Sequence, residues 1–361
     1  MYPFEGDEVY VRNCWYVAAA PFEIADGPIE RTIMSSPVAL FRMADGTPTA
    51  MHGVCPHRYY PLAEGRVVGD ALQCNYHGFQ FDGRTGSCVK VPFQAASPKQ
   101  FRQRIYPTAE HGGWIWIWPG DPALADVALL PPLEQAGLSD SWWVQVGPVL
   151  HAKGRAQLLV ENLLDITHLE FLHATALEAK GLLDFPVKFR QGPNGQAFAT
   201  RSTRTPWVPQ FYDLLYKEEN RFEGLHDALG STWYFSPAYL RTGVDIQSID
   251  ALETIDTSIY GTFYFQHFVT PETPHSVHYF SGCSRNYRHD DAEFDAIVMS
   301  IDTAVRNQDV AAIEAVERNL ANPAHLGPEL LVKSDTPAIT VRRQIQDILN
   351  LEANRSARSA A

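Results

Sequence analysis

The sequence predicts an α+β protein of two domains, an all-β domain at residues 1–122 and an α+β domain at residues 123–361. Short strand-like segments separated by turn dipeptides occupy the first third of the chain. A connector containing Pro and Ala follows, from about Asp121 to Pro132. After it, helix-like and strand-like patterns are mixed. A length of 361 residues is enough for two domains of ordinary size.

In the first domain, strands are expected at Pro37–Met43, at Ala71–Asp82 and at Trp114–Trp118. Turn dipeptides such as Asp45-Gly46 separate them, and Pro119-Gly120 closes the last one. This pattern of short strands and tight turns is typical of all-β structure.

The second domain is expected to begin with a helix at Lys153–Phe171. Strands follow at Tyr260–Thr270 and Val277–Arg285. A long helix is predicted at Asp290–Asn319, because apolar residues recur there at helical spacing. A last helix is expected at Ala338–Glu352.

Composition excludes several classes of protein. The chain has 29 Lys and Arg against 42 Asp and Glu, a net charge of −13, which argues against a nucleic-acid partner. The N-terminal segment carries early acids instead of a basic stretch, and no apolar run is long enough for a membrane span. We therefore expect a cytoplasmic protein with reduced thiols, and its five cysteines do not suggest a disulfide scaffold.

Two Cys/His pairs lie in loops between predicted strands. Cys55 and His57 form one pair, and Cys74 and His77 form the other after sixteen intervening residues. A Rieske [2Fe–2S] centre requires this donor set, two cysteines on one iron and two histidines on the other. The alternatives are a zinc site or four unrelated residues. Zinc sites usually space the ligands of each pair by two or more residues, so the first pair is too tight for that habit.

The residues beside these pairs indicate the type of Rieske centre. High-potential Rieske carriers have a further cysteine in each loop, and the two form a disulfide. Here those positions are Tyr60 and Tyr76, so a lower-potential, oxygenase-type cluster is expected. The remaining cysteines, Cys14, Cys88 and Cys283, are interpreted as small buried apolar residues.

A second group of candidate ligands lies in the predicted helix at Lys153–Phe171 and just beyond it. Asp165 and His168 are three residues apart and would share a helix face, and His173 follows near the helix end. Two histidines with a carboxylate from elsewhere form the facial triad of non-haem Fe(II) oxygenases. The alternative is a polar helix face with hydrogen-bonded histidines, but a Rieske motif in the same chain favours iron.

With these motifs, the chain resembles the oxygenase component of the Rieske non-haem iron oxygenases, in particular the vanillate O-demethylase and dicamba monooxygenase group. The segments Asn162–His173, Phe268–Thr273 and Gln308–Asn319 appear in the family's order. The resemblance implies a Rieske domain followed by a catalytic domain with an antiparallel sheet flanked by helices, of the helix-grip or START-like kind. The chain departs from most relatives at Tyr59-Tyr60, where small residues are usual.

The resemblance also implies roles for acids and for subunits. The third iron ligand would be Asp309, although helical periodicity alone leaves Asp302 open. Asp165 would bridge the metal sites, bonding His168 and, across a subunit boundary, His77. A cyclic homotrimer follows from this arrangement. Asn162 is expected to support the same turn.

The substrate pocket is predicted from one strand and from scattered aromatic residues. His267 stands on the predicted strand Tyr260–Thr270, where dicamba-type relatives have a substrate-contacting histidine, and Phe265 shares its face. Trp207 and Trp233 are further candidate wall residues. Ordinary sheet or core packing is the alternative for each of them.

The predicted function is a monooxygenase with a Rieske cluster and a mononuclear Fe(II). It would O-demethylate or hydroxylate a substituted aromatic acid, with dioxygen and with electrons from a separate NAD(P)H-dependent reductase of the ferredoxin or flavin type. One alternative is aromatic ring cis-dihydroxylation at the same iron. The other is a Rieske electron-transfer protein, which would not need the second domain.

Overall fold

The computed structural model describes residues 2–177, 185–192, 195–205, 226–249, 255–256 and 262–360. Its contacts divide the chain into two compact units. The N-terminal unit consists of Arg12–Leu130 together with Thr270–Pro274. The C-terminal unit consists of Met1–Val11, Pro131–Val269 and His275–Ala361. Each unit thus includes a short segment that is distant in sequence from the rest of that unit.

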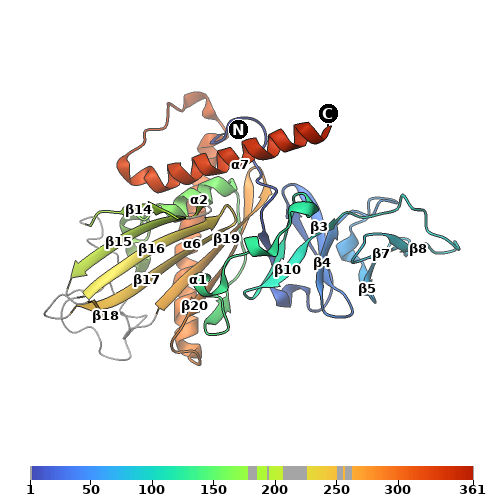
Figure 1. The fold of residues 1–361 in the computed structure, drawn as a ribbon, viewed down its shortest axis with the longest axis horizontal. Coiled ribbons are helices and arrows are strands. Elements are labelled where there is room, and N and C mark those ends of the chain that lie inside the picture. The colour runs from blue at the N-terminus through green and yellow to red at the C-terminus, as the bar shows by residue number, and fades with distance from the viewer. Residues whose placement is uncertain are drawn as a thin grey trace. The chain divides into compact units, whose positions relative to one another are not determined.

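Antiparallel sheets build the N-terminal unit (Figure 1). The strand Trp114–Ile117, which lies between two others in its sheet, is buried along its whole length. In the described residues the sheets have the orders β1-β11-β10, β2-β3-β4-β9 and β5-β6-β7-β8. The strands are β1 Tyr16–Ala19, β2 Ile29–Ile33, β3 Ser36–Arg42, β4 Pro48–His52, β5 Arg66–Val68, β6 Ala71–Gln73, β7 Gln80–Asp82, β8 Cys88–Lys90, β9 Ile105–Tyr106, β10 Thr108–His111 and β11 Trp114–Ile117.

The sheet β5-β6-β7-β8 carries one of the two Cys/His loops. The predicted strand Ala71–Asp82 is in fact two strands, β6 and β7, separated by a loop that contains Cys74 and His77. Beneath this loop, Leu72 and Phe81 are fully buried in one apolar cluster with both loop cysteines. The apolar residues therefore predict strand structure at both ends of this segment, but the loop that carries Cys74 and His77 separates it into two strands.

Among the described residues, the C-terminal unit contains a nine-stranded antiparallel sheet in the order β12-β20-β19-β17-β16-β15-β14 (Figure 1). Strand β13 pairs with β20, and β18 pairs with β17. The strands are β12 Trp143–Val146, β13 Leu150–Ala152, β14 Lys188–Gln191, β15 Ala197–Thr205, β16 His226–Ser236, β17 Tyr239–Ile249, β18 Ile255–Asp256, β19 Thr262–Thr273 and β20 Ser276–Arg285.

Helices α2 (Ala156–Leu164), α6 (Ala292–Leu320) and α7 (Thr336–Ala360) pack on this sheet and on one another. Helix α6 begins where the Asp291 carboxylate accepts the Phe294 N–H, a regular N-cap. Of its apolar residues, Phe294, Val298 and Ile313 are buried, while Val316 is exposed. Charged residues are buried on it as well: Asp302, Arg306, Asp309 and Glu317. None of the helices in the described part of the chain combines the length and apolarity that crossing a bilayer requires.

The predicted helix Lys153–Phe171 is wrong as a single element. Helix α2 ends at Leu164, and Asp165 follows with ψ 106, outside the helical region. The Asp165 carboxylate accepts hydrogen bonds from the N–H and the hydroxyl of Thr167 at 2.7 and 2.5 Å. Such a local side-chain bond competes with the helix ladder and ends it. Two single-turn helices follow, α3 (Leu169–Leu172) and α4 (Ala174–Leu177).

Candidate metal centres

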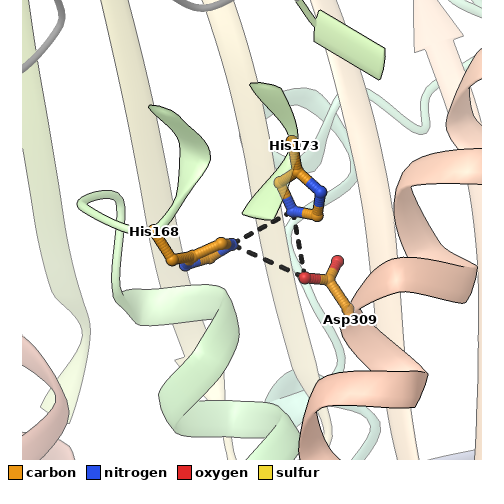
Figure 2. A group of neighbouring side chains, drawn as sticks. All are labelled: His168, His173 and Asp309. Atoms are coloured by element: carbon orange, nitrogen blue, oxygen red, sulfur yellow. Dashed lines mark hydrogen bonds and ion pairs between the residues drawn. The ribbon is translucent and has the colours of Figure 1, made fainter. Parts of the chain in front are cut away.

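Three candidate ligands from distant parts of the sequence meet in the C-terminal unit. Figure 2 shows His168 and His173 facing Asp309, which helix α6 supplies. The two Nε2 atoms are 3.2 Å apart, and the Asp309 Oδ1 lies 3.5 Å from the His168 Nε2 and 3.1 Å from the His173 Nε2. Three ligand atoms from three side chains thus point at one position.

This geometry fits a transition-metal ion. Ligands at about 2.1 Å and at right angles around an ion lie about 3.0 Å from one another, close to the spacings found here. The Asp309 Oδ1 is buried and accepts no hydrogen bond, although it belongs to a carboxylate that is only 4% exposed. A buried carboxylate oxygen without a donor is costly, and a cation held by these three side chains would remove that cost.

Neighbouring charges shift the pKa values of His168 and Asp309 in opposite directions. Burial lowers the pKa of His168, but the neighbouring carboxylates of Asp165 and Asp309 outweigh burial and raise it to about 9. Burial raises the pKa of Asp309, but the two imidazoles outweigh burial and lower it to about 2. The site therefore favours positive charge beside Asp309, which is the condition for cation binding.

The predicted alternative ligand, Asp302, does not reach the histidines. It lies seven residues before Asp309 on α6, and its carboxylate is buried against Arg306, with the Arg306 Nη2 at 2.6 Å. A buried carboxylate that already has a guanidinium partner is satisfied without a metal. The structure therefore brings Asp309, and not Asp302, to His168 and His173.

The other ring nitrogens of the two histidines have different neighbours. The His173 Nδ1 donates to the Gln308 Oε1 at 2.7 Å. The His168 Nδ1 lies 3.7 Å from the Asp165 Oδ2, which is beyond direct hydrogen-bond distance. The Asp165 side chain is 34% exposed and can be reached from outside the chain. Asn162 lies in the last turn of α2, just before Asp165, and its Oδ1 is buried without a hydrogen-bond partner.

Gln308 is a site residue that sequence reasoning did not find. Its only sequence feature is its position next to Asp309, and adjacent helix residues do not normally face the same side. The contact exists because His173 approaches α6 from a separate segment, which no local pattern reveals.

The two Cys/His loops of the N-terminal unit have the same backbone pattern. The Cys55 N–H donates to the Tyr60 carbonyl at 2.9 Å, and the Cys74 N–H donates to the Phe79 carbonyl at 2.8 Å. Each cysteine carbonyl in turn accepts the N–H of the residue four positions later, Tyr59 or Gly78. The sequence spacing Cys-x-His and Cys-x-x-His thus corresponds to two matching turns.

The donor groups of these loops lie together. Both cysteines are 1% exposed, and the rings of His57 and His77 are 4.6 Å apart between centroids. Burial raises the pKa of the Cys55 thiol to about 11, and the Cys74 thiol beside it contributes. The His57 Nδ1 is buried and has no hydrogen-bond partner. Two thiols and two imidazoles with free ligand atoms fit a [2Fe–2S] cluster of the Rieske type.

The positions of the missing cysteines also lie side by side. The rings of Tyr60 and Tyr76 are 5.6 Å apart between centroids. Where a high-potential Rieske protein has a disulfide, this chain has two neighbouring aromatic rings, and none of its five cysteines forms a disulfide. Cys88 and Cys283 are buried, while Cys14 is partly exposed.

The predicted pocket residues are only partly described. His267 is buried on β19, and both of its ring nitrogens are engaged, by the Thr242 hydroxyl at 2.8 Å and the Tyr279 hydroxyl at 2.5 Å. Burial lowers its pKa to about 3, so the ring is neutral. Phe265 is partly buried beside Phe263.

Of the two tryptophans predicted to line the pocket, the structure describes one. Trp233 packs against Phe198 and lies under the Arg241 guanidinium. Its prediction as a wall residue beside His267 is wrong, because the strand register places Trp233 on the Gln266 face of the sheet, opposite His267. Trp207 lies outside the described residues.

Comparisons with known proteins agree with both centres. Residues 14–107 match the Rieske [2Fe-2S] domain, and residues 152–351 match the vanillate O-demethylase oxygenase C-terminal domain. The oxygenase component of dicamba O-demethylase from Stenotrophomonas maltophilia is 35% identical, over 95% of this chain and 99% of that protein. The vanillate O-demethylase oxygenase subunit of Pseudomonas sp. (strain HR199 / DSM 7063) is 30% identical, over 95% and 96%.

Solved structures show the same relation. A crystal structure of dicamba monooxygenase with non-haem iron and dicamba matches with a TM-score of 0.79 and 34% identity, over 96% of this chain and 99% of that one. These matches confirm the predicted α+β fold class and the Rieske-type oxygenase. The chain therefore belongs to the vanillate O-demethylase family of Rieske oxygenase components.

Proposed function

We propose that this chain is the oxygenase component of an aromatic monooxygenase that O-demethylates or hydroxylates a substituted aromatic acid. The observation that carries this proposal is the convergence of His168, His173 and Asp309 in the same chain as two Cys/His loops. One centre suits the storage of single electrons and the other an oxygen-activating metal, and a Rieske oxygenase needs both.

The chain's own residues fit a division of labour between the two centres. Cys55, His57, Cys74 and His77 would hold the [2Fe–2S] cluster, and His168, His173 and Asp309 would hold a mononuclear Fe(II). When bound, the iron supplies dioxygen activation and the cluster supplies electrons one at a time. Three protein ligands would leave coordination positions of the ion for dioxygen.

Electrons would pass between subunits through Asp165. Its carboxylate lies on the outer side of His168, and it is exposed enough to meet His77 of the partner subunit. Head-to-tail contacts of this kind close into a cyclic homotrimer. The electrons would come from a separate NAD(P)H-dependent reductase. The free cysteines suit a cytoplasmic location.

The substrate would lie near β19, with His267 and Phe265 as contacts. Because the His267 ring is neutral, it would recognise the substrate by a hydrogen bond and not by an ion pair. One of its present partners, Thr242 or Tyr279, would have to release a ring nitrogen for this contact.

The activity is tested by supplying methoxybenzoates, toluates and arylsulfonates with a surrogate reductase and NADH. In a demethylation, each turnover consumes dioxygen, a pair of electrons and a pair of protons, and releases a phenol, formaldehyde and water. We expect formaldehyde and oxygen uptake in equal amounts with at least one methoxylated acid. A cis-dihydrodiol without formaldehyde would instead establish ring dihydroxylation.

A further inference from the structure

His173 has little local structure to orient it. It stands between two single-turn helices, α3 and α4, and its backbone is non-helical, with φ −103 and ψ 16. Its side chain is nevertheless 1% exposed and points at the same position as the Asp309 carboxylate. A buried ligand on such a short segment needs a partner elsewhere to fix its ring.

Gln308 is that partner. Its carbonyl oxygen accepts the His173 Nδ1–H at 2.7 Å, which places the proton on Nδ1 and leaves the lone pair on Nε2. The Nε2 atom is 3.1 Å from the Asp309 Oδ1. On helix α6, Asp309 is thus a candidate ligand, and the adjacent Gln308 orients a second candidate ligand, His173.

We propose that Gln308 is a positioning residue of the mononuclear iron site, an inference that rests on the proposed function. It fixes the ring plane and the tautomer of His173, and as a neutral amide it adds no charge. His168 differs, because its outer nitrogen faces the Asp165 carboxylate. The two histidines thus have distinct supports, one neutral and internal and the other anionic and partly exposed.

The test uses the full chain with its Rieske cluster intact and Co(II) as the probe ion at the mononuclear site. The variants are Gln308→Leu, which removes the acceptor, and Gln308→Glu, which keeps it. The neighbouring Asn307→Ala is the control, because Asn307 is an exposed residue of the same helix turn. Two readouts are followed, Co(II) affinity by chelator competition and the paramagnetically shifted imidazole N–H signals in the proton NMR spectrum.

We expect Gln308→Leu to weaken Co(II) binding by about 10- to 100-fold, the usual effect of losing such an outer partner. One imidazole N–H signal should be lost to rapid exchange with water. Gln308→Glu should keep both signals and bind Co(II) at least as tightly as the unmodified protein, because the acceptor remains. Asn307→Ala should match the unmodified protein in both readouts.

Unchanged affinity and unchanged N–H signals in Gln308→Leu would overturn the proposal. Equal loss in the Leu and Glu variants would also overturn it, because packing and not the hydrogen bond would then be responsible. If Gln308→Leu does not fold, Gln308→Asn takes its place, since its shorter side chain loses the contact but stays polar. An unmodified protein that binds no Co(II) at these ligands would overturn the proposed function itself.

Discussion

Asp165 has two contacts that suit different purposes. One oxygen is occupied by Thr167, which ends helix α2, and the other lies 3.7 Å from the His168 ring. The first contact fixes the carboxylate in place, and the second keeps negative charge beside a candidate ligand. The acid is therefore built into the turn, and its side chain also remains partly exposed.

Replacing Asp165 by Asn should separate structure from electron transfer. The amide oxygen can still accept from Thr167, so both metal centres should remain loaded. Turnover should fall by at least about tenfold, because the proposed electron path loses its carboxylate. Metal analysis and single-turnover kinetics check this, with Asp140→Asn as an exposed control. Wild-type turnover in Asp165→Asn would remove this residue from the electron path.

Most of the candidate ligands could be predicted at the residue scale, and their surroundings could not. Cys55, His57 and the other loop ligands have a spacing set by local turns, so sequence alone identifies them. Choosing Asp309 over Asp302 needed the family resemblance, because both lie on the buried face of α6. Gln308 contacts His173 across 135 positions of sequence, and only the folded chain reveals that contact.

Among the structural elements, the two ligand loops differ at one equivalent backbone position. Tyr59 has φ 57 and Gly78 has φ 74, both in the left-handed region. Glycine adopts that region without cost, whereas other residues lose about 1 to 2 kcal/mol. Tyr59 is also 81% exposed, so burial offsets little of this cost. The first loop is therefore strained where the second is relaxed.

Tyr59→Gly should stabilise the N-terminal unit by about 0.5 to 1 kcal/mol, the relieved strain less the extra freedom of the unfolded chain. Thermal loss of the cluster's visible absorption measures this. Tyr76→Gly is the control, since Tyr76 is an exposed ligand-loop residue whose φ is not positive. A lower midpoint for Tyr59→Gly than for Tyr76→Gly would show that the Tyr59 ring makes a stabilising contact in the assembled protein.

Gly78→Ala should have the opposite effect. Its φ of +74 disfavours a side chain, and the added Cβ would lie 3.0 Å from the Pro92 Cγ. We expect a loss of about 1 to 2 kcal/mol, seen in the same absorption assay. Gly46→Ala is a matched control with φ +84 and open space around it. An equal loss in both variants would mean that Pro92 contributes nothing.

Periodicity predicted the long elements well and the short ones poorly. Helix α6 and strand β20 lie within a few residues of their predicted bounds, because many residues contribute to each pattern. The break at Asp165 was missed, since a single carboxylate hydrogen bond overrides several residues of helical pattern. The ligand loop at Cys74 was likewise hidden inside an apolar segment.

On the scale of the whole molecule, a buried ion pair joins helices α2 and α6. The Arg155 guanidinium binds the Glu317 carboxylate at 2.7 Å through two nitrogens, and His275 contacts the same carboxylate at 2.8 Å. Burial raises the pKa of Glu317, but these partners outweigh it and lower the pKa to about 2. The contact links the start of α2 to the end of α6 and so supports the helices around the iron ligands.

This pair should make folding sensitive to acid. Since the folded pKa of Glu317 is below its unfolded value of 4.5, its stabilisation is present above pH 4.5 and is lost as the pH falls toward 2. Glu317→Gln should cost about 3 kcal/mol at pH 7 and much less near pH 3. Urea unfolding at both pH values tests this, with Glu314→Gln as control. An equal cost at both pH values would contradict it.

Iron counting tests whether this chain holds a mononuclear iron in addition to its Rieske cluster. Iron and acid-labile sulfide are measured in the unmodified protein, in Asp309→Asn and in Asp302→Asn. We expect Asp309→Asn to lower the iron content from about three to about two per chain at constant sulfide. Asp302→Asn should keep all the iron. Unchanged iron in Asp309→Asn, or about two irons in the unmodified protein, would contradict the account and leave an electron carrier.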